Sequence, residues 1–403
     1  MILKKSLIAL TIVSSLALSC SLANSQNLKK NPKWVSSALL KVERHAKNML
    51  PSVLEAKQTP RSIEKGLRHS RDWTSGFYPG TLWYLYEYTN NKYWKDNAET
   101  VTEFLVEEQF NTNDHDVGFR VYCSYGNGWL LTKNPEYKKA VIQAAKSLGT
   151  RFNEKTETIM SWNPRKDRDW KYPVIIDNMM NLELMYEAAK LSGDNSLAEL
   201  ATRHADKTMK YHYRENYSCP HVVDYDPETG EFRKMDWNNG FCDPEVAAWS
   251  RGQSWGLYGF TLMYRETKDE KYLKHAEKIA EFLLNHPNMP EDMVPYWDYS
   301  SPKIPTMRDA SAGAIMASAL MELSTYSKNG NRYFKAGEKM LKSLSSDQYL
   351  AKPGSNGDFA IKHCTGNYLS GSEVNNTLSY ADYYYVEGLC RYLKLINKKA
   401  LFN

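Results

Sequence analysis

Two kinds of apolar segment alternate along the chain. In the first kind, apolar residues recur every three or four positions with polar residues between them, as at Ala276, Ile279, Ala280 and Leu283. This spacing predicts helices with one buried face. Each such segment follows a short polar turn, in which Asp or Asn is expected to cap the helix by accepting backbone N–H groups. These turns lie at 89–93, 132–137, 192–197, 267–272 and 327–333.

The second kind of segment precedes each polar turn and is rich in Gly, Ala, Met and aromatic residues. It has few charges on most faces, so we expect helices that are buried on more than one side. These segments are 76–88, 119–131, 176–191, 250–265 and 310–326, and helices at 34–49 and 376–395 complete a set of twelve.

Twelve helices in alternating buried and half-exposed pairs predict an all-α protein, a closed (α/α)6 barrel with the buried set as its inner ring. An open solenoid of helical hairpins has the same local pattern and is the alternative. No Pro-, Gly- or Ser-rich linker interrupts the repeat, so a single domain is expected from 30 to 403. Strands are expected only as small ones in the loops near 219–234.

Residues 1–20 have the features of an export signal. Lys4 and Lys5 form a basic start, and the apolar run at 7–18 is too short to span a bilayer as a helix. Residues 21–23 suit an ordinary signal peptidase, whereas 16–20 form a loose lipobox that would leave Cys20 lipidated. We therefore expect a periplasmic protein of a Gram-negative bacterium, either soluble or lipid-anchored at Cys20.

Composition narrows the function classes. The formal net charge is +5 for 403 residues and no block of Lys and Arg stands out, so nucleic acid is not an expected partner. The cysteines beyond Cys20 are odd in number and lack a C-x-x-C pair, which argues against a disulfide framework and a zinc site. Aromatic residues make up 13% of the chain, which suits the binding of sugar rings but also suits a large aromatic core.

Five residues with distinctive side chains stand just before or at the start of a segment of the buried kind. In a barrel of alternating helices, all the inner N-termini open at the same rim. We therefore expect these residues to converge on one funnel mouth, where functional loops gather. They are Trp73, Asp116, Asp177, Arg251 and Asp309.

Asp177 and Asp116 are the candidate catalytic pair, since paired carboxylates across a sugar are usual in glycosidases. Asp177 has apolar neighbours, and desolvation is expected to raise its pKa against the lowering effect of a helix N-terminus, as a general acid requires. The alternatives are a helix cap for Asp177 and a solvated turn for Asp116. A metal site at 114–116 is a weaker option, because adjacent residues rarely point at one ion.

Other residues are candidates for binding the sugar. Trp73 and Trp162 could be stacking platforms, and His221 lies in a loop. Arg251 could clamp a carboxylate through two parallel hydrogen bonds, or could be held in a cation–π stack by an indole ring nearby. The indole rings in question are those of Trp249 and Trp255.

An ordered set of motifs resembles the unsaturated glucuronyl hydrolases of glycoside hydrolase family 88. The resemblance covers about residues 34–395. Its His-Asp-x-Gly-Phe element distinguishes the chain from the related unsaturated rhamnogalacturonyl hydrolases. The motifs are DWTSGFYPG at 72–80, HDVGF at 115–119, IDNMMN at 176–181, WSRGQSWG at 249–256 and ADYYYVE at 381–387.

The resemblance implies an (α/α)6 barrel, no metal or organic cofactor, and hydration of the C4=C5 bond that a polysaccharide lyase leaves on a terminal uronic acid. In this family the aspartate matching Asp177 donates a proton to C4 and activates water for attack at C5. The aspartate matching Asp116 holds ring hydroxyls, and its charge would stabilise the positive charge that develops at C5 while Asp177 carries the proton. The matching substrate-binding positions are Trp73, Trp162, His221, Arg251 and Trp255, together with Asn239, which stands where the family is expected to have glutamine.

The expected substrate is an unsaturated oligosaccharide of glycosaminoglycan type, and no obligate protein partner is expected. Two other functions fit a similar toroid. A polysaccharide lyase would create the double bond with a Tyr or His base, and a non-catalytic glycan-binding lipoprotein would use the aromatic rim alone.

Basic residues in the loops 164–171 and 352–365 could contact sulfate, although solvated loop charges are the commoner explanation.

Overall fold

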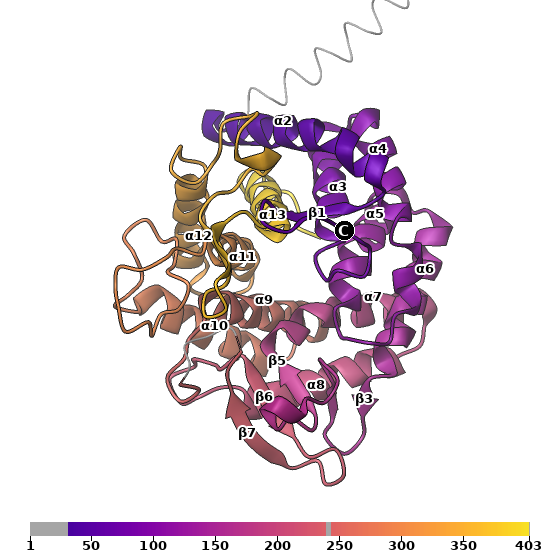
Figure 1. Cartoon of the computed structure of the whole chain (residues 1–403), viewed down its shortest axis with the longest axis vertical. Helices are drawn as coiled ribbons and strands as arrows, with labels where there is room; N and C mark the ends of the chain where they lie inside the picture. The colour runs from indigo at the N-terminus through magenta and orange to yellow at the C-terminus, as the bar shows by residue number, and fades with distance from the viewer. Residues whose placement is uncertain (1–30, 239–242, 403) are drawn as a thin grey trace, which may run out of the picture.

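The computed structural model describes residues 31–238 and 243–402 as a closed ring of helices, seen down its axis in Figure 1. The predicted export signal at 1–20, with Cys20, lies outside the described residues, as does Asn239. Within the described ranges, no helix is both long and apolar enough to cross a membrane.

Six helical segments form the inner ring, and each contacts the next. The last, α13, contacts the first, α3, which closes the circle (Figure 1). Their Gly, Ala and aromatic composition allows packing on several sides, and every residue of α11 is buried. The segments are α3 (Phe77–Thr89), η2 (Gly118–Gly126) with α5 (Asn127–Thr132), η4 (Ile176–Asn181) with α7 (Leu182–Ser192), α9 (Ser250–Thr267), α11 (Ala310–Leu323) and α13 (Ser379–Ile396).

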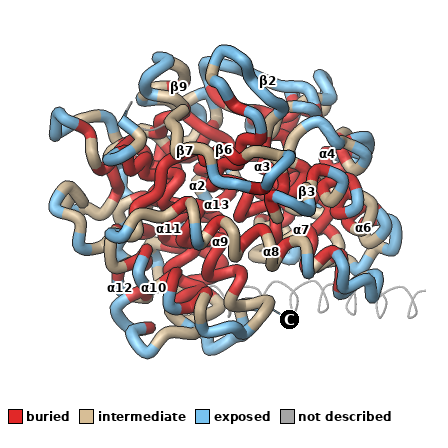
Figure 2. Tube along the Cα trace, turned by 90° about the horizontal axis from the view of Figure 1, so that it is seen from below, coloured by how far each residue is buried: buried red, intermediate tan, exposed pale blue. Residues whose placement is uncertain are grey.

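Six amphipathic helices cover this ring from outside. In α12, for example, the buried residues recur at helical spacing along one face, as the apolar pattern predicts. Figure 2 shows buried residues concentrated in the inner helices and exposed residues in the peripheral loops. The prediction of an all-α (α/α)6 barrel is confirmed. The outer helices are α2 (Lys33–Ala56), α4 (Lys92–Glu103), α6 (Pro135–Gly149), α8 (Ser196–Tyr211), α10 (Glu270–Asn285) and α12 (Gly330–Leu344).

The predicted caps hold at three of the five outer helices. The side chains of Asn91, Asn134 and Asp269 accept backbone N–H groups two residues ahead. Before α8, Asn195 makes no side-chain cap, and Asp194 of the same turn accepts the backbone N–H of Ser196 at 3.0 Å. Before α12 no side chain caps the helix.

Two inner segments begin irregularly, a feature that apolar spacing does not reveal. The segment η2 is a π-helix and η4 is a 3₁₀-helix. They are held together by Asn181, whose side-chain oxygen accepts the backbone N–H of Phe119 at 3.0 Å. Gly118 permits this contact, because a Cβ there would lie 2.5 Å from the same oxygen. Irregular helical turns of this kind often mark functional sites.

Short antiparallel strands precede several inner helices. The strands predicted near 219–234 are present as β6 (Val222–Tyr225) and β7 (Phe232–Asp236), and β5 (Pro173–Ile175) pairs with β6. The remaining hairpins were not predicted from the sequence. They are β1 (Thr59–Ser62) with β2 (Gly66–Arg68), β3 (Phe152–Asn153) with β4 (Thr158–Ile159), and β8 (Cys364–Asn367) with β9 (Ser372–Asn376).

Candidate active site at the inner-helix N-termini

Asp177 lies where β5 passes into η4, at the rim formed by the inner-helix N-termini. The register of β5 against β6 pairs Ile175 with Val222, so His221 comes beside the start of η4. The backbone N–H of Ile176 donates to the carbonyl of His221 at 3.2 Å. In consequence, Nε2 of His221 lies 3.3 Å from Oδ1 of Asp177, whose side chain is 12% exposed.

The surroundings of Asp177 favour its ionised form. Burial raises the pKa of this carboxyl, but the hydrogen bond and charge of His221, together with the charge of Arg251, outweigh burial. The resulting pKa lies below the ordinary aspartate value. The sequence-based expectation that desolvation would prevail at Asp177 is therefore wrong for the free protein.

Asp116 is the second carboxyl of the candidate site, and its pKa is displaced in the opposite direction. Burial raises its pKa well above the ordinary value, and the negative charges of Asp114 and Asp177 add to this effect while Arg120 opposes it. The influence of Asp177 on Asp116 shows that the two carboxyls share one electrostatic environment. The order of their pKa values is the reverse of that expected from the sequence, because burial and the charge of Asp114 prevail at Asp116, whereas the hydrogen bond and charge of His221 outweigh burial at Asp177.

His115 contacts Asp116, and the charge of Arg120 opposes the rise in the pKa of Asp116. Sequence analysis did not assign either residue to the site. Nε2 of the fully buried His115 lies 3.3 Å from Oδ1 of Asp116, and burial lowers the pKa of His115 to about 4. Arg120 donates to both oxygens of Asp114 at 2.9 Å. The position of His115 next to Asp116 in the HDVGF motif was the one available hint.

A metal site at 114–116 finds no support in this arrangement. The Asp114 carboxylate is bound to Arg120, and the described residues contain no group of three or more side chains placed to hold an ion. The cysteines Cys123, Cys219, Cys364 and Cys390 are buried free thiols.

Trp73 and Trp162 are half-buried aromatic residues near the inner-helix N-termini. Trp73 packs on Tyr380, with ring centroids 4.9 Å apart. Trp162 stacks on Trp170 at 5.7 Å and meets the ring of His221 edge-on at 5.6 Å. Both tryptophans therefore retain partly exposed surface, as a stacking platform for a sugar requires.

Arg251 is almost fully buried, and its guanidinium is engaged with the protein. It donates to Oδ2 of Asp309 at 2.8 Å and to the carbonyls of Thr365 and Gly366 in β8. Its Cζ lies 4.5 Å from the ring centroid of Trp249, so the stacking alternative describes its position. Arg251 also contributes positive charge that lowers the pKa of Asp177.

Trp255 is fully buried behind the pocket wall, where it packs against Phe119 at 5.3 Å and Tyr384 at 5.4 Å. Its position makes it a support for the aromatic wall rather than a surface that meets solvent. The placement of Asn239 is not described, so its predicted role stays a prediction.

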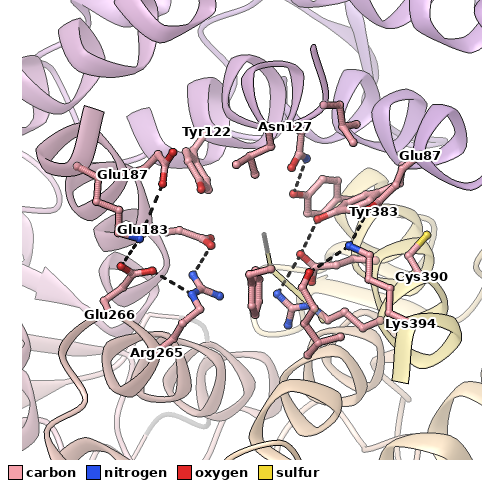
Figure 3. A pocket seen from close by; sticks show the side chains of 18 of the residues that line it. Glu87, Tyr122, Asn127, Glu183, Glu187, Arg265, Glu266, Tyr383, Cys390 and Lys394 are labelled. Atoms are coloured by element: carbon pink, nitrogen blue, oxygen red, sulfur yellow. Dashed lines mark hydrogen bonds and ion pairs between the residues drawn. The ribbon is translucent and has the colours of Figure 1, made fainter. Parts of the chain in front are cut away.

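A cavity of about 250 Å³ lies at the opposite end of the barrel, between the C-terminal halves of inner helices (Figure 3). It contains none of the predicted site residues. Its charged side chains pair with one another, since Arg265 contacts Glu183, Glu266 at 3.0 Å and Glu322 at 3.1 Å. These ion pairs connect three neighbouring inner helices, α7, α9 and α11. The N-terminal rim, which carries the predicted site residues, is therefore the candidate active site.

Comparisons with known proteins match this chain over most of its length. The family model of Glycosyl Hydrolase Family 88 matches residues 45–392. An unsaturated glucuronyl hydrolase of Formosa agariphila is 41% identical over 388 residues, covering 94% of this chain and 95% of the relative. An unsaturated chondroitin disaccharide hydrolase of Streptococcus pyogenes serotype M1 is 32% identical, covering 80% of this chain and 82% of the relative. The crystal structure of an unsaturated glucuronyl hydrolase specific for heparin superposes with a TM-score of 0.86 at 42% identity, covering 93% of this chain and all of that one.

Proposed function

This chain belongs to Glycosyl Hydrolase Family 88, and on that premise we propose that it removes a terminal 4,5-unsaturated uronic acid from lyase-generated oligosaccharides of glycosaminoglycan type. The names of the relatives, which refer to glucuronyl, chondroitin and heparin substrates, support this substrate class. The structural observation that carries the proposal is a pair of largely buried carboxyls at the inner-helix N-termini, Asp116 and Asp177, whose pKa values are displaced in opposite directions.

Asp177 donates a proton to C4 of the unsaturated ring, and a water molecule adds to C5. The water loses its proton to the Asp177 carboxylate, so the residue returns to its starting form and the net change is addition of water. The product at C5 is a hemiketal, which opens, and the glycosidic bond is then lost without displacement at the anomeric carbon. One acid and one water are sufficient because the ring oxygen stabilises the cation formed by protonation at C4.

The bound substrate favours the protonated form of Asp177, which the reaction needs and the free site disfavours. Asp177 is held ionised when the site is free, and a uronate carboxylate bound beside it adds a negative charge that raises its pKa. Protonation of Asp177 removes a negative charge that raises the pKa of Asp116, which favours an ionised Asp116; this carboxylate contacts the sugar and stabilises the positive charge developing at C5. Trp73 and Trp162 bind the sugar faces, His221 and Asn239 bind polar groups of the substrate, and Arg251 and Trp255 complete the site by charge and packing.

The ultraviolet absorbance of the conjugated double bond tests the function. We expect the protein to lower the absorbance of unsaturated glycosaminoglycan disaccharides. A rise in absorbance on intact polymer would identify a lyase, and binding without any absorbance change would identify a non-catalytic glycan-binding protein. Either of those results would reject the proposed hydrolase.

Replacing His221 by Gln should move the alkaline limb of the pH profile of kcat/KM to higher pH. His221 lowers the pKa of Asp177, and glutamine can donate a hydrogen bond but cannot supply the positive charge, so in the variant burial raises that pKa. Turnover that requires protonated Asp177 is lost as pH rises past this pKa, and the loss then occurs at higher pH. The control Trp162→Phe should lower kcat/KM without moving the limb, and an unmoved limb in the His221 variant contradicts the coupling.

We also propose export to the periplasm of a Gram-negative bacterium, on the basic start at Lys4 and Lys5 and the apolar run that follows. Mass spectrometry of the mature N-terminus distinguishes a lipidated Cys20 from cleavage after Ala23. An intact N-terminus that retains Met1 would contradict export by this signal.

A further inference from the structure

The loop between β4 and β5 and the facing strand β7 carry several basic side chains, nearly all of which are neutralised. Lys171 contacts Asp226 at 2.8 Å, and Arg233 contacts Asp169 at 3.0 Å. Arg165 pairs with Asp167 in the same way, and Lys234 pairs with Asp236. Arg168 and Lys166 differ, since among the described residues no carboxylate lies within 4.0 Å of either side chain, and of the two only Arg168 is partly buried.

Aromatic rings hold the Arg168 side chain in place. Its Cζ lies 4.4 Å from the ring centroid of Trp237 and 5.7 Å from that of Trp170. Cation–π contacts of this kind fix a guanidinium without using its N–H groups. Among the described residues these N–H groups donate to no acceptor, so they are available to an anion. A positioned arginine with unused donors is suited to an oxyanion, which it can bind through two parallel hydrogen bonds.

The position of Arg168 relative to Asp177 indicates which part of a substrate it would meet. His221 contacts Asp177, Trp162 contacts His221, and Trp170 stacks on Trp162. Arg168 comes next in this series of contacts, on Trp170, and its side chain is partly exposed. A uronic acid bound at Asp177 with its neighbouring sugar placed over Trp162 and Trp170 would bring that sugar to Arg168.

We propose that Arg168 binds a sulfate group on the sugar joined to the unsaturated uronic acid, and so determines preference for sulfated substrates. The inference rests on the proposed hydrolase function. A sulfate presents three oxygens to the planar donors of a guanidinium, and a sulfate ester and an N-sulfate offer the same oxygens. Arg168 contacts the part of the substrate that does not react, so its contribution should appear in binding.

The test compares kcat/KM on unsaturated disaccharides whose second sugar is unsulfated, O-sulfated or N-sulfated. In Arg168→Gln we expect kcat/KM on a sulfated disaccharide to fall about tenfold or more, through a raised KM, with less than about a twofold change on the unsulfated one. Arg168→Lys should recover part of the loss, because it restores the charge without the paired donors. Lys166→Gln is the matched control: this exposed residue has the same charge in the same loop, and its removal should change neither rate.

The O-sulfated and N-sulfated substrates show which linkage the site accepts, and an effect on either one supports the proposal. An equal loss on sulfated and unsulfated substrates would instead assign Arg168 to holding the Trp170 and Trp237 rings, and would overturn it. An unchanged Arg168→Gln variant, or a wild-type protein that cleaves only unsulfated disaccharides, would also overturn it while leaving the hydrolase function standing. A wild-type protein that cleaves none of the disaccharides would reject the hydrolase function itself, and the inference with it.

Discussion

Asp177→Asn is expected to bind unsaturated disaccharides and to lose turnover by about 10³-fold or more. Asparagine has the shape of aspartate and can still contact His221, so the pocket should keep its form. The amide can neither give a proton to C4 nor take one from water. Steady-state kinetics measures the loss, and calorimetric titration measures the retained binding.

A surface carboxylate supplies the control for that variant. The side chain of Asp347 is 82% exposed and pairs with Lys41 at the periphery, so Asp347→Asn should keep wild-type kinetics. Turnover at the wild-type rate in Asp177→Asn would remove this residue from the role of proton donor.

Asp116→Asn is expected to lower kcat by about 10²-fold with a smaller effect on KM. The amide resembles the protonated form that the free pocket favours, so folding and sugar binding should be retained. It cannot ionise to stabilise the positive charge that develops at C5, so the loss belongs to the transition state. A wild-type rate would exclude Asp116 from the reaction.

The same variant should change the pH dependence of stability. A buried carboxyl whose pKa is raised in the folded state contributes stability below its unfolded pKa, and that contribution is lost as pH rises through the folded value. Relative to Asp116→Asn, the wild-type free energy of unfolding should therefore fall as pH rises through this range. Denaturant unfolding at several pH values measures the difference, and parallel pH curves for the two proteins would contradict the raised pKa.

Short sequence motifs account for some features of the site, whereas others depend on contacts between segments that are distant in the chain. The sequence motifs place Asp116 and Asp177 at the starts of inner segments, and the closed ring brings those starts to one rim. The contact between Asp177 and His221 depends on the register of β5 against β6, which no local pattern specifies. The contacts of Arg251 could not be predicted from its local sequence either, because its partners lie far along the chain. They are Asp309, just before α11, and Gly366 in β8.

The sequence by itself determined the helices, their two classes and the candidate carboxyls, because apolar spacing and most capping residues act within a few residues of one another. The irregular starts of η2 and η4, the hairpins of the rim and the order of the two pKa values were decided only by the tertiary structure. Hydrogen bonds and charges act across space rather than along the chain, so the neighbours of a buried carboxyl become known only when distant segments have packed together.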